Sequence, residues 1–400
     1  MFDFDTPVER VGTRSEKYDL RRRLFGTDAV EPLWVADMDF AAPPAVQAAL
    51  AARVAHPVYG YTVVPDAVPE ALSGWLARRH GWQVDSHRVA LAPGVVPTLY
   101  AAVAAFTEPG QGVVVQPPVY PPLFDAVTRQ GRVVLENPLL QGSGRESGAG
   151  YSMDLDRLEE LARGGARLLL LCSPHNPVGR VWREDELRAV LDIARRHGMA
   201  ILSDEIHADL VYAPRHGAAA DAPLHIPLGR IATAEDAVAT AVAPSKTFNI
   251  PGLGLSAVIS SSDAVASRLA EAFGRLPVSV ANPLGLVAFE AAYREGDTWL
   301  DACLDVLRAN RDALFEALTS AVDGWVKGTP PEATYLAWLD CRGTGMEDTH
   351  LMRAWVEAGL GLSAGARFGV GGSGFMRLNF AIPPSRMADC LRRVAAFSRR

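Results

Sequence analysis

The stretch "AVATAVAPSKTFNIPGLGLSAVIS", residues 237–260, places a short polar cluster between two apolar runs. The runs 237–243 and 255–260 are rich in small and β-branched residues with little polar alternation, which is typical of strands covered on both faces of a sheet. The cluster between them contains Lys246. Only three of the chain's 39 lysines and arginines are lysines (Lys17, Lys246 and Lys327), so a lysine in this apolar setting needs a specific reason.

Five earlier apolar runs predict the rest of the same sheet. Helical patterns lie between the runs, and the one at 184–198 has acidic residues in its first turn, basic residues in its last turn and Gly198 as its stop. This alternation of strand and helix predicts an α/β fold with a mostly parallel, doubly wound sheet. The five runs are "RVALA" (88–92), "GVVVQ" (112–116), "RVVLE" (132–136), "RLLLLC" (167–172) and "MAILSD" (199–204).

The pattern changes after residue 285, which indicates a second, smaller α+β domain. A long helical pattern over about 285–322 is followed by "TYLAWLDC" (334–341) and "GFMRLNFA" (374–381). We therefore expect a large domain over 46–284 and a small domain formed by 1–45 together with 285–400. The Gly/Ser-rich segment 137–153 is expected to be a surface excursion of the large domain.

Composition and charge exclude several classes of protein. A net charge of −7 and a pI near 5.8 give no basic field for nucleic acid. The four cysteines lie far apart without a C-x-x-C pair, which indicates neither a zinc site nor a disulfide framework. The first residues lack the apolar core of a signal peptide, and no apolar run approaches the ~18 residues of a membrane helix. We expect a soluble cytoplasmic enzyme.

In doubly wound sheets, ligands bind beyond the carboxyl ends of the strands. Four predicted strands are followed there by a distinctive residue: Gly94, Asn176, Asp204 and Lys246. Each has an ordinary explanation when it is taken alone. Asp204 is equally well explained as a helix N-cap, and Asn176 as an ordinary residue of a turn. Gly94 could be part of an ordinary strand-to-helix turn, and Lys246 could be a surface lysine.

Together the four positions supply what pyridoxal 5'-phosphate requires. The helix that starts after Gly94 presents the N–H groups of Val95 and Val96 to a phosphate. A lysine amine condenses with an aldehyde, which a guanidinium does not usefully do. A buried carboxylate keeps the pyridine nitrogen protonated, and an amide binds the phenolic oxygen. The combination predicts this cofactor.

Three motifs, "SPHNPVGRVW", "LSDEIHADLVY" and "APSKTFNIPGLG", resemble in this order the fold-type I pyridoxal-phosphate enzymes, the aspartate aminotransferase superfamily. The resemblance spans nearly the whole chain. It implies that Lys246 bonds the cofactor aldehyde and that Asp204 pairs with the pyridine nitrogen. It also implies that Asn176 bonds the phenolic oxygen and that Tyr120, in "PPVYPP", stacks on the cofactor ring.

The same resemblance assigns residues outside the three motifs. Arg377 would bind the substrate carboxylate as a bidentate fork, although a surface arginine at a strand edge would look the same in sequence. Ser245 would donate to the phosphate. His207 would lie near the cofactor edge, and a capping or core histidine explains it equally well. Tyr61, or its neighbour Tyr59, would reach the cofactor phosphate of a second chain, which implies a homodimer with shared active sites.

Two positions depart from the pattern of this superfamily. Many members carry a serine three residues before the lysine and an arginine eight residues after it, both on the phosphate. Here those positions are Ala243 and Gly254. We therefore expect the phosphate to depend on the helix N-terminus, on Ser245 and on Tyr61 from a partner chain.

The early motif "PLWVADMDF" (32–40), with "YGYT" and "DEIHADLVY", resembles the branch of carbon–sulfur lyases similar to cystathionine β-lyase, the MalY/PatB type. The resemblance implies that Ala36 and Asp37 line the substrate side of the pocket. Packing of an N-terminal arm would account for Trp34 and Phe40 in the same motif. The implied reaction is β-elimination from cystathionine or a related cysteine S-conjugate, which yields a thiol, pyruvate and ammonia.

Other functions stay open at the level of sequence. If Lys246 returned the proton to the cofactor instead, the outcome would be amino-group transfer to a 2-oxo acid, and pocket shape would decide between the two reactions. A pyridoxal-phosphate-binding regulator without turnover is also consistent with the motifs. The run "GVGGSG" (369–374) matches G-x-G-x-x-G, but it precedes a strand rather than opening a helix, which argues against a dinucleotide site.

Overall fold

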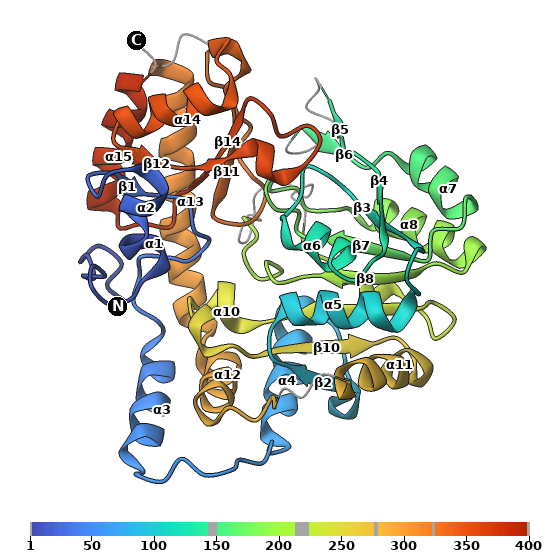
Figure 1. Ribbon diagram of the computed structural model, residues 1–400. Helices are drawn as coiled ribbons and strands as arrows, with labels where there is room; N and C mark the ends of the chain where they lie inside the picture. The colour runs from blue at the N-terminus through green and yellow to red at the C-terminus, as the bar shows by residue number, and fades with distance from the viewer. Residues whose placement is uncertain (1, 143–149, 213–223, 276–278, 322–324, 398–400) are drawn as a thin grey trace.

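The computed structural model describes residues 2–142, 150–212, 224–275, 279–321 and 325–397. Its largest sheet has seven strands, which match the seven apolar runs (Figure 1). Neighbouring strands are parallel except β10, which is antiparallel to both β2 and β9, so the prediction of a mostly parallel doubly wound sheet is confirmed. The strands in sheet order are β2 (Val89–Ala92), β10 (Ser256–Ser260), β9 (Val238–Val242), β8 (Ala200–Asp204), β7 (Leu168–Cys172), β3 (Gly112–Val115) and β4 (Val133–Glu136).

Helices cover both faces of this sheet, which explains why its strands are apolar throughout. Along β7, Leu168 and Leu170 pack into one hydrophobic cluster, while Leu169 and Leu171 pack into another on the opposite face. The first cluster includes α5 (Val95–Phe106), α6 (Pro122–Thr128) and α11 (Asp263–Gly274). The second includes α7 (Leu155–Arg163), α8 (Glu184–His197) and the short α9 (Leu228–Ile231).

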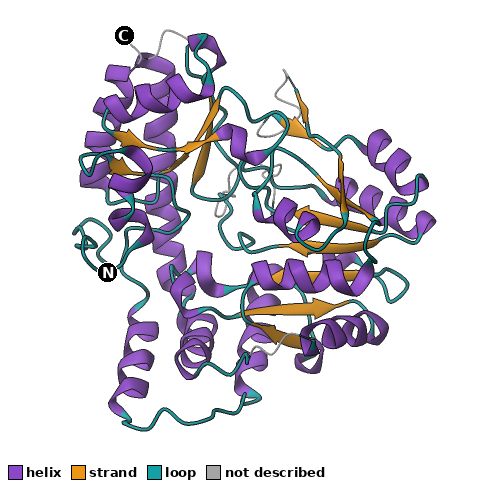
Figure 2. Cartoon of the chain, in the orientation of Figure 1, coloured by secondary structure: helices purple, strands orange, loops and turns teal. Residues whose placement is uncertain are grey.

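A smaller group of strands is separate from the seven-stranded sheet (Figure 2). Its antiparallel sheet contains β11 (Leu336–Asp340), β14 (Phe375–Asn379) and β13 (Ser363–Ala364). The N-terminal arm joins this part because β1 (Glu31–Pro32) pairs in parallel with β12 (Leu360–Gly361). The helices of the arm are α1 (Glu16–Asp19) and α2 (Arg21–Phe25), and those of the C-terminal part are α13 (Asp297–Ala321), α14 (Asp348–Glu357) and α15 (Pro384–Phe397).

The structure has two helices where the sequence predicts one helical pattern over about 285–322. They are α12 (Pro283–Glu295) and α13, which meet at Gly296. A Cβ at Gly296 would lie 2.2 Å from Cε1 of Phe248, so this helix junction requires glycine. Phe248 is two positions after Lys246, so the junction packs close to the predicted site. α12 packs against α3 (Pro44–Ala55) and α4 (Ala67–His80). The long connection between α3 and α4 runs along the lower edge of Figure 1.

The expected surface excursion at 137–153 is partly described. β5 (Leu140–Gln141) pairs with β6 (Tyr151–Ser152), and residues 143–149 between them lie outside the described ranges. Tyr151 and Met153 are buried in the hydrophobic cluster under α7 and α8, so the excursion returns into the core. No helix within the described ranges is long and apolar enough to span a membrane.

Candidate active site

A pocket of about 900 Å³ opens at the carboxyl edge of the seven-stranded sheet. The residues that follow β2, β3, β7, β8 and β9 converge there, together with the segment 34–40 of the N-terminal arm and residues of the small sheet. Every predicted site residue except Tyr61 lines this pocket. They are Ala36, Asp37, Gly94, Val95, Val96, Tyr120, Asn176, Asp204, His207, Ser245, Lys246 and Arg377.

Lys246 lies in the short helix α10 (Pro244–Thr247), directly after β9. Its Nζ donates a hydrogen bond to the backbone carbonyl of Ala36 at 2.6 Å. Burial lowers the pKa of its amine to about 8, although the negative charge of Asp37 opposes this shift. An amine with this pKa is neutral in a substantial fraction of molecules near pH 8, which is the form that attacks an aldehyde or removes a proton.

Asp204 is the last residue of β8, and 4% of its surface is exposed. Its Oδ1 accepts a hydrogen bond from the Ile206 N–H at 3.2 Å, and it forms no salt bridge with any residue in the described ranges. Burial raises the pKa of the carboxyl to about 6. A buried carboxylate without a cationic partner is costly, so this position suits a ligand that brings a positive charge.

Asn176 and Arg377 contact each other across the pocket. Arg377 projects from the middle of β14, and its Nη1 donates to Asn176 Oδ1 at 3.1 Å while its Nη2 donates to the Trp34 carbonyl at 2.9 Å. The bond to Arg377 occupies the amide oxygen of Asn176, which leaves the Asn176 NH₂ group as the donor for a ligand oxygen.

Arg377 itself retains capacity for an anionic ligand. Its Nε is buried without a hydrogen-bond partner, and no carboxylate in the described ranges forms a salt bridge with it. Burial lowers the pKa of its guanidinium to about 10. An unpaired buried cation is unfavourable, so the position favours a substrate carboxylate.

The turn after β2 forms an anion cradle. Gly94 is the N-cap of α5 with a φ of 154°, and the Val95 and Val96 N–H groups have no acceptor inside the helix. A side chain at Gly94 would be strained at this φ and would lie 3.4 Å from Pro97 Cδ. Ser245 lines the same pocket, as do Ala243 and Gly254, neither of which has a polar side chain.

Tyr120 and His207 complete the pocket wall. Burial raises the pKa of the Tyr120 phenol, which therefore stays neutral. Burial also lowers the pKa of His207 to about 3, and its Nδ1 has no hydrogen-bond partner among the residues that the structure describes. The His207 ring meets Tyr335 edge to face at a centroid distance of 5.9 Å. A neutral imidazole at this position forms part of the pocket wall and leaves its Nδ1 available to a ligand.

Tyr61 is placed away from the pocket within its own chain. It lies in the connection between α3 and α4, and its side chain is fully exposed. Tyr59 in the same connection donates to the Val54 carbonyl at 2.9 Å. The assignment of Tyr61 to a shared active site therefore stays a prediction.

Several residues that contact the site were not found by sequence reasoning. Tyr335 donates to the Ala36 carbonyl at 2.8 Å, beside the bond from Lys246. Asn379 and Asn249 bind backbone atoms of the segment 34–40, and Lys17 contacts Asp37 from the N-terminal arm. Only Lys17 had a sequence signal, because it is one of three lysines in a chain that otherwise uses arginine.

The residues of this pocket fit pyridoxal phosphate on the chemistry they present. The amine of Lys246 suits the aldehyde, and the buried carboxyl of Asp204 suits a protonated ring nitrogen. The Asn176 NH₂ suits the phenolic oxygen, and the start of α5 suits the phosphate. The fold and this set of side chains define a pyridoxal-phosphate enzyme.

The particular family follows from comparison with known sequences. The chain belongs to the aminotransferase class I and II family, whose sequence model matches residues 33–394. It is 39% identical to cystathionine beta-lyase PatB of Bacillus subtilis, over 98% of this chain and 99% of that protein. It is 34% identical to protein MalY of Escherichia coli, over 97% of this chain and 96% of that protein.

A solved structure agrees with the sequence comparison. Cystalysin of Treponema denticola, which contains pyridoxal 5'-phosphate, matches with a TM-score of 0.92 and 34% sequence identity. The match covers 99% of this chain and 98% of that chain. The resemblance stated from the sequence motifs is thereby confirmed.

Proposed function

We propose that this protein is a pyridoxal-phosphate-dependent carbon–sulfur β-lyase that cleaves cystathionine or a related cysteine S-conjugate to a thiol, pyruvate and ammonia. The observation that carries the proposal is that a partly neutral lysine amine and a buried arginine without a carboxylate partner in the described ranges line the same pocket. The identity of 39% to a cystathionine beta-lyase over nearly the full length supports this branch of the family.

Different residues of the chain carry out different parts of this reaction. Arg377 binds the substrate carboxylate and so fixes the orientation of the amino acid. The neutral amine of Lys246 removes the α-proton as general base. Pyridoxal phosphate, when bound, supplies the electron sink that stabilises the resulting negative charge. As the bond between the β-carbon and sulfur breaks, the electron pair of the α-carbon forms a double bond to the β-carbon, and the sulfur leaves as a thiolate with the electrons of the broken bond. Hydrolysis of the released enamine by water gives pyruvate and ammonia.

Asp204 and Asn176 support this chemistry electrostatically. The Asp204 carboxylate pairs with a positive charge at the ring nitrogen, and this pairing stabilises the ionised carboxylate that burial alone disfavours. The amide of Asn176, oriented by the bond from Arg377, would donate to the phenolic oxygen of the cofactor. Asp204 is fixed by its position at the end of β8 and Asn176 by its bond from Arg377, so neither group needs to rearrange during the reaction.

Amino-group transfer is the alternative outcome, because it also begins with removal of the α-proton by Lys246. One experiment separates the two. Purified protein is offered cystathionine without any keto-acid acceptor, and pyruvate is measured with a coupled dehydrogenase. We expect stoichiometric pyruvate and thiol. Turnover that depends strictly on added 2-oxoglutarate would instead establish an aminotransferase, and colour without any turnover would favour a regulatory protein.

The proposal includes a homodimer whose two chains share each active site. The connection between α3 and α4 exposes the side chains of Val58, Tyr59, Tyr61 and Val63. Exposed apolar and aromatic side chains grouped in one segment are typical of a surface that a partner covers. Around the anion cradle, Ala243 and Gly254 offer no side-chain donor. A phenol from the partner subunit would supply one.

We also propose that the protein works in the cytoplasm. The four cysteines, Cys172, Cys303, Cys341 and Cys390, are all free thiols and all buried. Free thiols are typical of proteins kept in a reducing compartment. Fractionation of the source cells, with pyruvate release as the assay, tests the location.

A further inference from the structure

The segment 34–40 forms one wall of the pocket and has no regular secondary structure. Its backbone is held instead by side chains from distant parts of the chain. Five consecutive carbonyls, those of residues 34 to 38, each accept at least one hydrogen bond from a side chain. The donors are Arg377 and Ser363 to residue 34, Asn379 to residue 35, Lys246 and Tyr335 to residue 36, Asn379 and Lys17 to residue 37, and Asn249 and Arg10 to residue 38.

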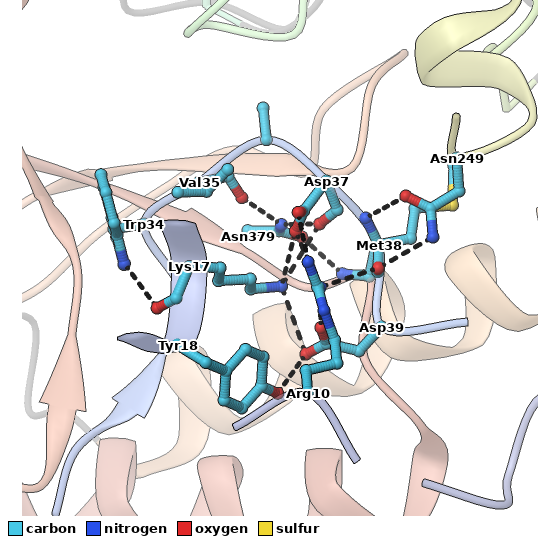
Figure 3. Close-up of polar contacts among 12 residues, drawn as sticks. Arg10, Lys17, Tyr18, Trp34, Val35, Asp37, Met38, Asp39, Asn249 and Asn379 are labelled. Atoms are coloured by element: carbon cyan, nitrogen blue, oxygen red, sulfur yellow. Dashed lines mark hydrogen bonds and ion pairs between the residues drawn. The ribbon is translucent and has the colours of Figure 1, made fainter. Parts of the chain in front are cut away.

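Beside this segment lies an ion cluster that includes Arg10, Lys17, Asp37 and Asp39 (Figure 3), and Arg386 adds a further contact to Asp39. Arg10 bridges the two carboxylates, with Nη2 at 2.6 Å from Asp37 Oδ2 and Nη1 at 2.5 Å from Asp39 Oδ1. The Lys17 ammonium lies 3.5 Å from Asp37 Oδ1 and 3.2 Å from Asp39 Oδ2. The side chains of Lys17 and Asp39 are fully buried.

The chemistry of Lys17 indicates that its site is specific. Its Nζ also donates to the Asp37 carbonyl at 3.3 Å, so one ammonium joins two carboxylates and one backbone oxygen. A compact ammonium with three rotatable donors suits this arrangement, whereas a planar guanidinium does not. The chain uses arginine for almost every other cation. Lys17 and Lys246 therefore each occupy a site that favours lysine over arginine.

The ion cluster connects directly to Lys246 through one peptide unit. The carbonyl of Ala36 and the N–H of Asp37 belong to the same planar group. Lys17 and Arg10 hold the Asp37 side chain, and Lys17 also holds the Asp37 carbonyl. The peptide unit whose oxygen accepts from Lys246 is thus held at its Asp37 end by the ion cluster. Buried ion pairs add little net stability, so stability alone does not account for this cluster.

We propose that Lys17 is a positioning residue of the reaction: with Arg10 it fixes the peptide between Ala36 and Asp37, whose oxygen holds the Lys246 amine whenever that amine is not bonded to the cofactor. The inference rests on the proposed function, because only a reaction that frees the amine for proton transfer needs it held. It places Lys17 in the step that moves the α-proton, and not in cofactor or substrate binding.

The kinetic test compares Lys17→Met with Arg386→Met. Arg386 is a matched control because its Nη1 pairs with Asp39 Oδ2 at 3.0 Å, yet it contacts neither Ala36 nor Asp37. For Lys17→Met we expect kcat to fall about 10- to 100-fold, as misplacement of a reacting group does, with KM and cofactor content close to those of the parent. The α-deuterium isotope effect on kcat should rise, while Arg386→Met keeps the parental kcat and isotope effect.

A second measurement needs no turnover. In cofactor-free protein, acetic anhydride at pH 10 labels Lys246, whose amine is then neutral, and the exposed Lys327 serves as internal reference. We expect the ratio of labelling at Lys246 to labelling at Lys327 to increase several-fold in Lys17→Met, because the amine is no longer held. Equal ratios in the parent and the variant would overturn the proposal, as would parallel losses of kcat in Lys17→Met and Arg386→Met.

If Lys17→Met does not fold, the double variant Lys17→Met/Asp39→Asn restores the balance of charge in the ion cluster. We expect this variant to regain stability while kcat stays low and the labelling ratio stays high. Recovery of both values with stability would overturn the positioning role. Failure of the parent protein to release pyruvate would refute the proposed function, and the labelling ratio would still report on Lys17.

Discussion

The amine of Lys246 donates a hydrogen bond to the backbone carbonyl of Ala36, a residue 210 positions earlier in the chain, at 2.6 Å. The bond joins α10, which follows β9, to the N-terminal arm. It therefore couples the end of the large sheet to the segment 34–40, which lines the pocket. Tyr335, the residue just before β11 of the small sheet, donates to the same oxygen.

Replacing Asp204 by Asn should abolish most of the activity while the fold persists. The substitution keeps the shape and the bond from Ile206 but removes the charge that pairs with the ring nitrogen. We expect kcat/KM to fall about 100- to 1,000-fold, the range typical of removing one preorganised electrostatic group. Pyruvate release measures this loss, and an Asp204→Asn protein with parental activity would contradict the role of the carboxylate.

Replacing Arg377 by Lys should weaken substrate binding more than it affects the chemical step. The lysine keeps a positive charge but loses the planar fork that binds Asn176 and Trp34 and that we propose also binds the substrate carboxylate. Hydrogen bonds to charged groups contribute about 1.5–3 kcal/mol, so we expect KM to rise about 10- to 100-fold. Steady-state kinetics with cystathionine decides, and an unchanged KM would remove Arg377 from substrate binding.

The dependence of kcat on pH should report Lys246. The neutral amine is the active form, so kcat should rise with pH and level off above about 8, the pKa that burial gives this group. The charge of Asp37 opposes the effect of burial and raises this pKa. In Asp37→Asn we therefore expect the rising limb of the profile to move to lower pH. A limb that stays in place or moves to higher pH would contradict this assignment.

Mixing two inactive variants should restore activity if the active site is shared between chains. Tyr61→Ala removes the phenol offered to the partner subunit, and Lys246→Ala removes the reactive amine. A mixed dimer contains one site with both defects and one site with neither. After dissociation and reassociation of equal amounts, we expect about a quarter of the parental activity, as statistical pairing in a two-fold dimer gives. Activity no higher than that of the separate variants would contradict a shared site.

The strands and their functional ends could be predicted because the signals are local. Strands buried on both faces need continuous apolar runs, and parallel strands bring their carboxyl ends to one edge. Asp204 ends such a run and Lys246 lies shortly after one, so a sequence window of a few residues was sufficient to place them. Gly94 was placed by the same argument at the start of α5.

The wall formed by the segment 34–40 could not be predicted to the same degree. Its geometry depends on side chains that come from α1, α10, β14 and the residue just before β11, and no local pattern links Lys17 or Asn379 to residue 37. The family resemblance placed Ala36 and Asp37 at the substrate side. The structure adds that Ala36 contributes its carbonyl to Lys246 and that the Asp37 carboxylate is held by Arg10.

The role of Lys246 is tested most directly by reduction of the purified protein with borohydride. The reduced protein is then digested, and the peptides that contain its three lysines are analysed by mass spectrometry. We predict yellow protein whose colour is lost on reduction, with the cofactor fixed to the peptide that contains Lys246 and to neither Lys17 nor Lys327. Lys246→Arg protein should carry no fixed cofactor. Cofactor fixed to another lysine, or persisting in Lys246→Arg, would contradict the central claim that Lys246 is the reactive amine.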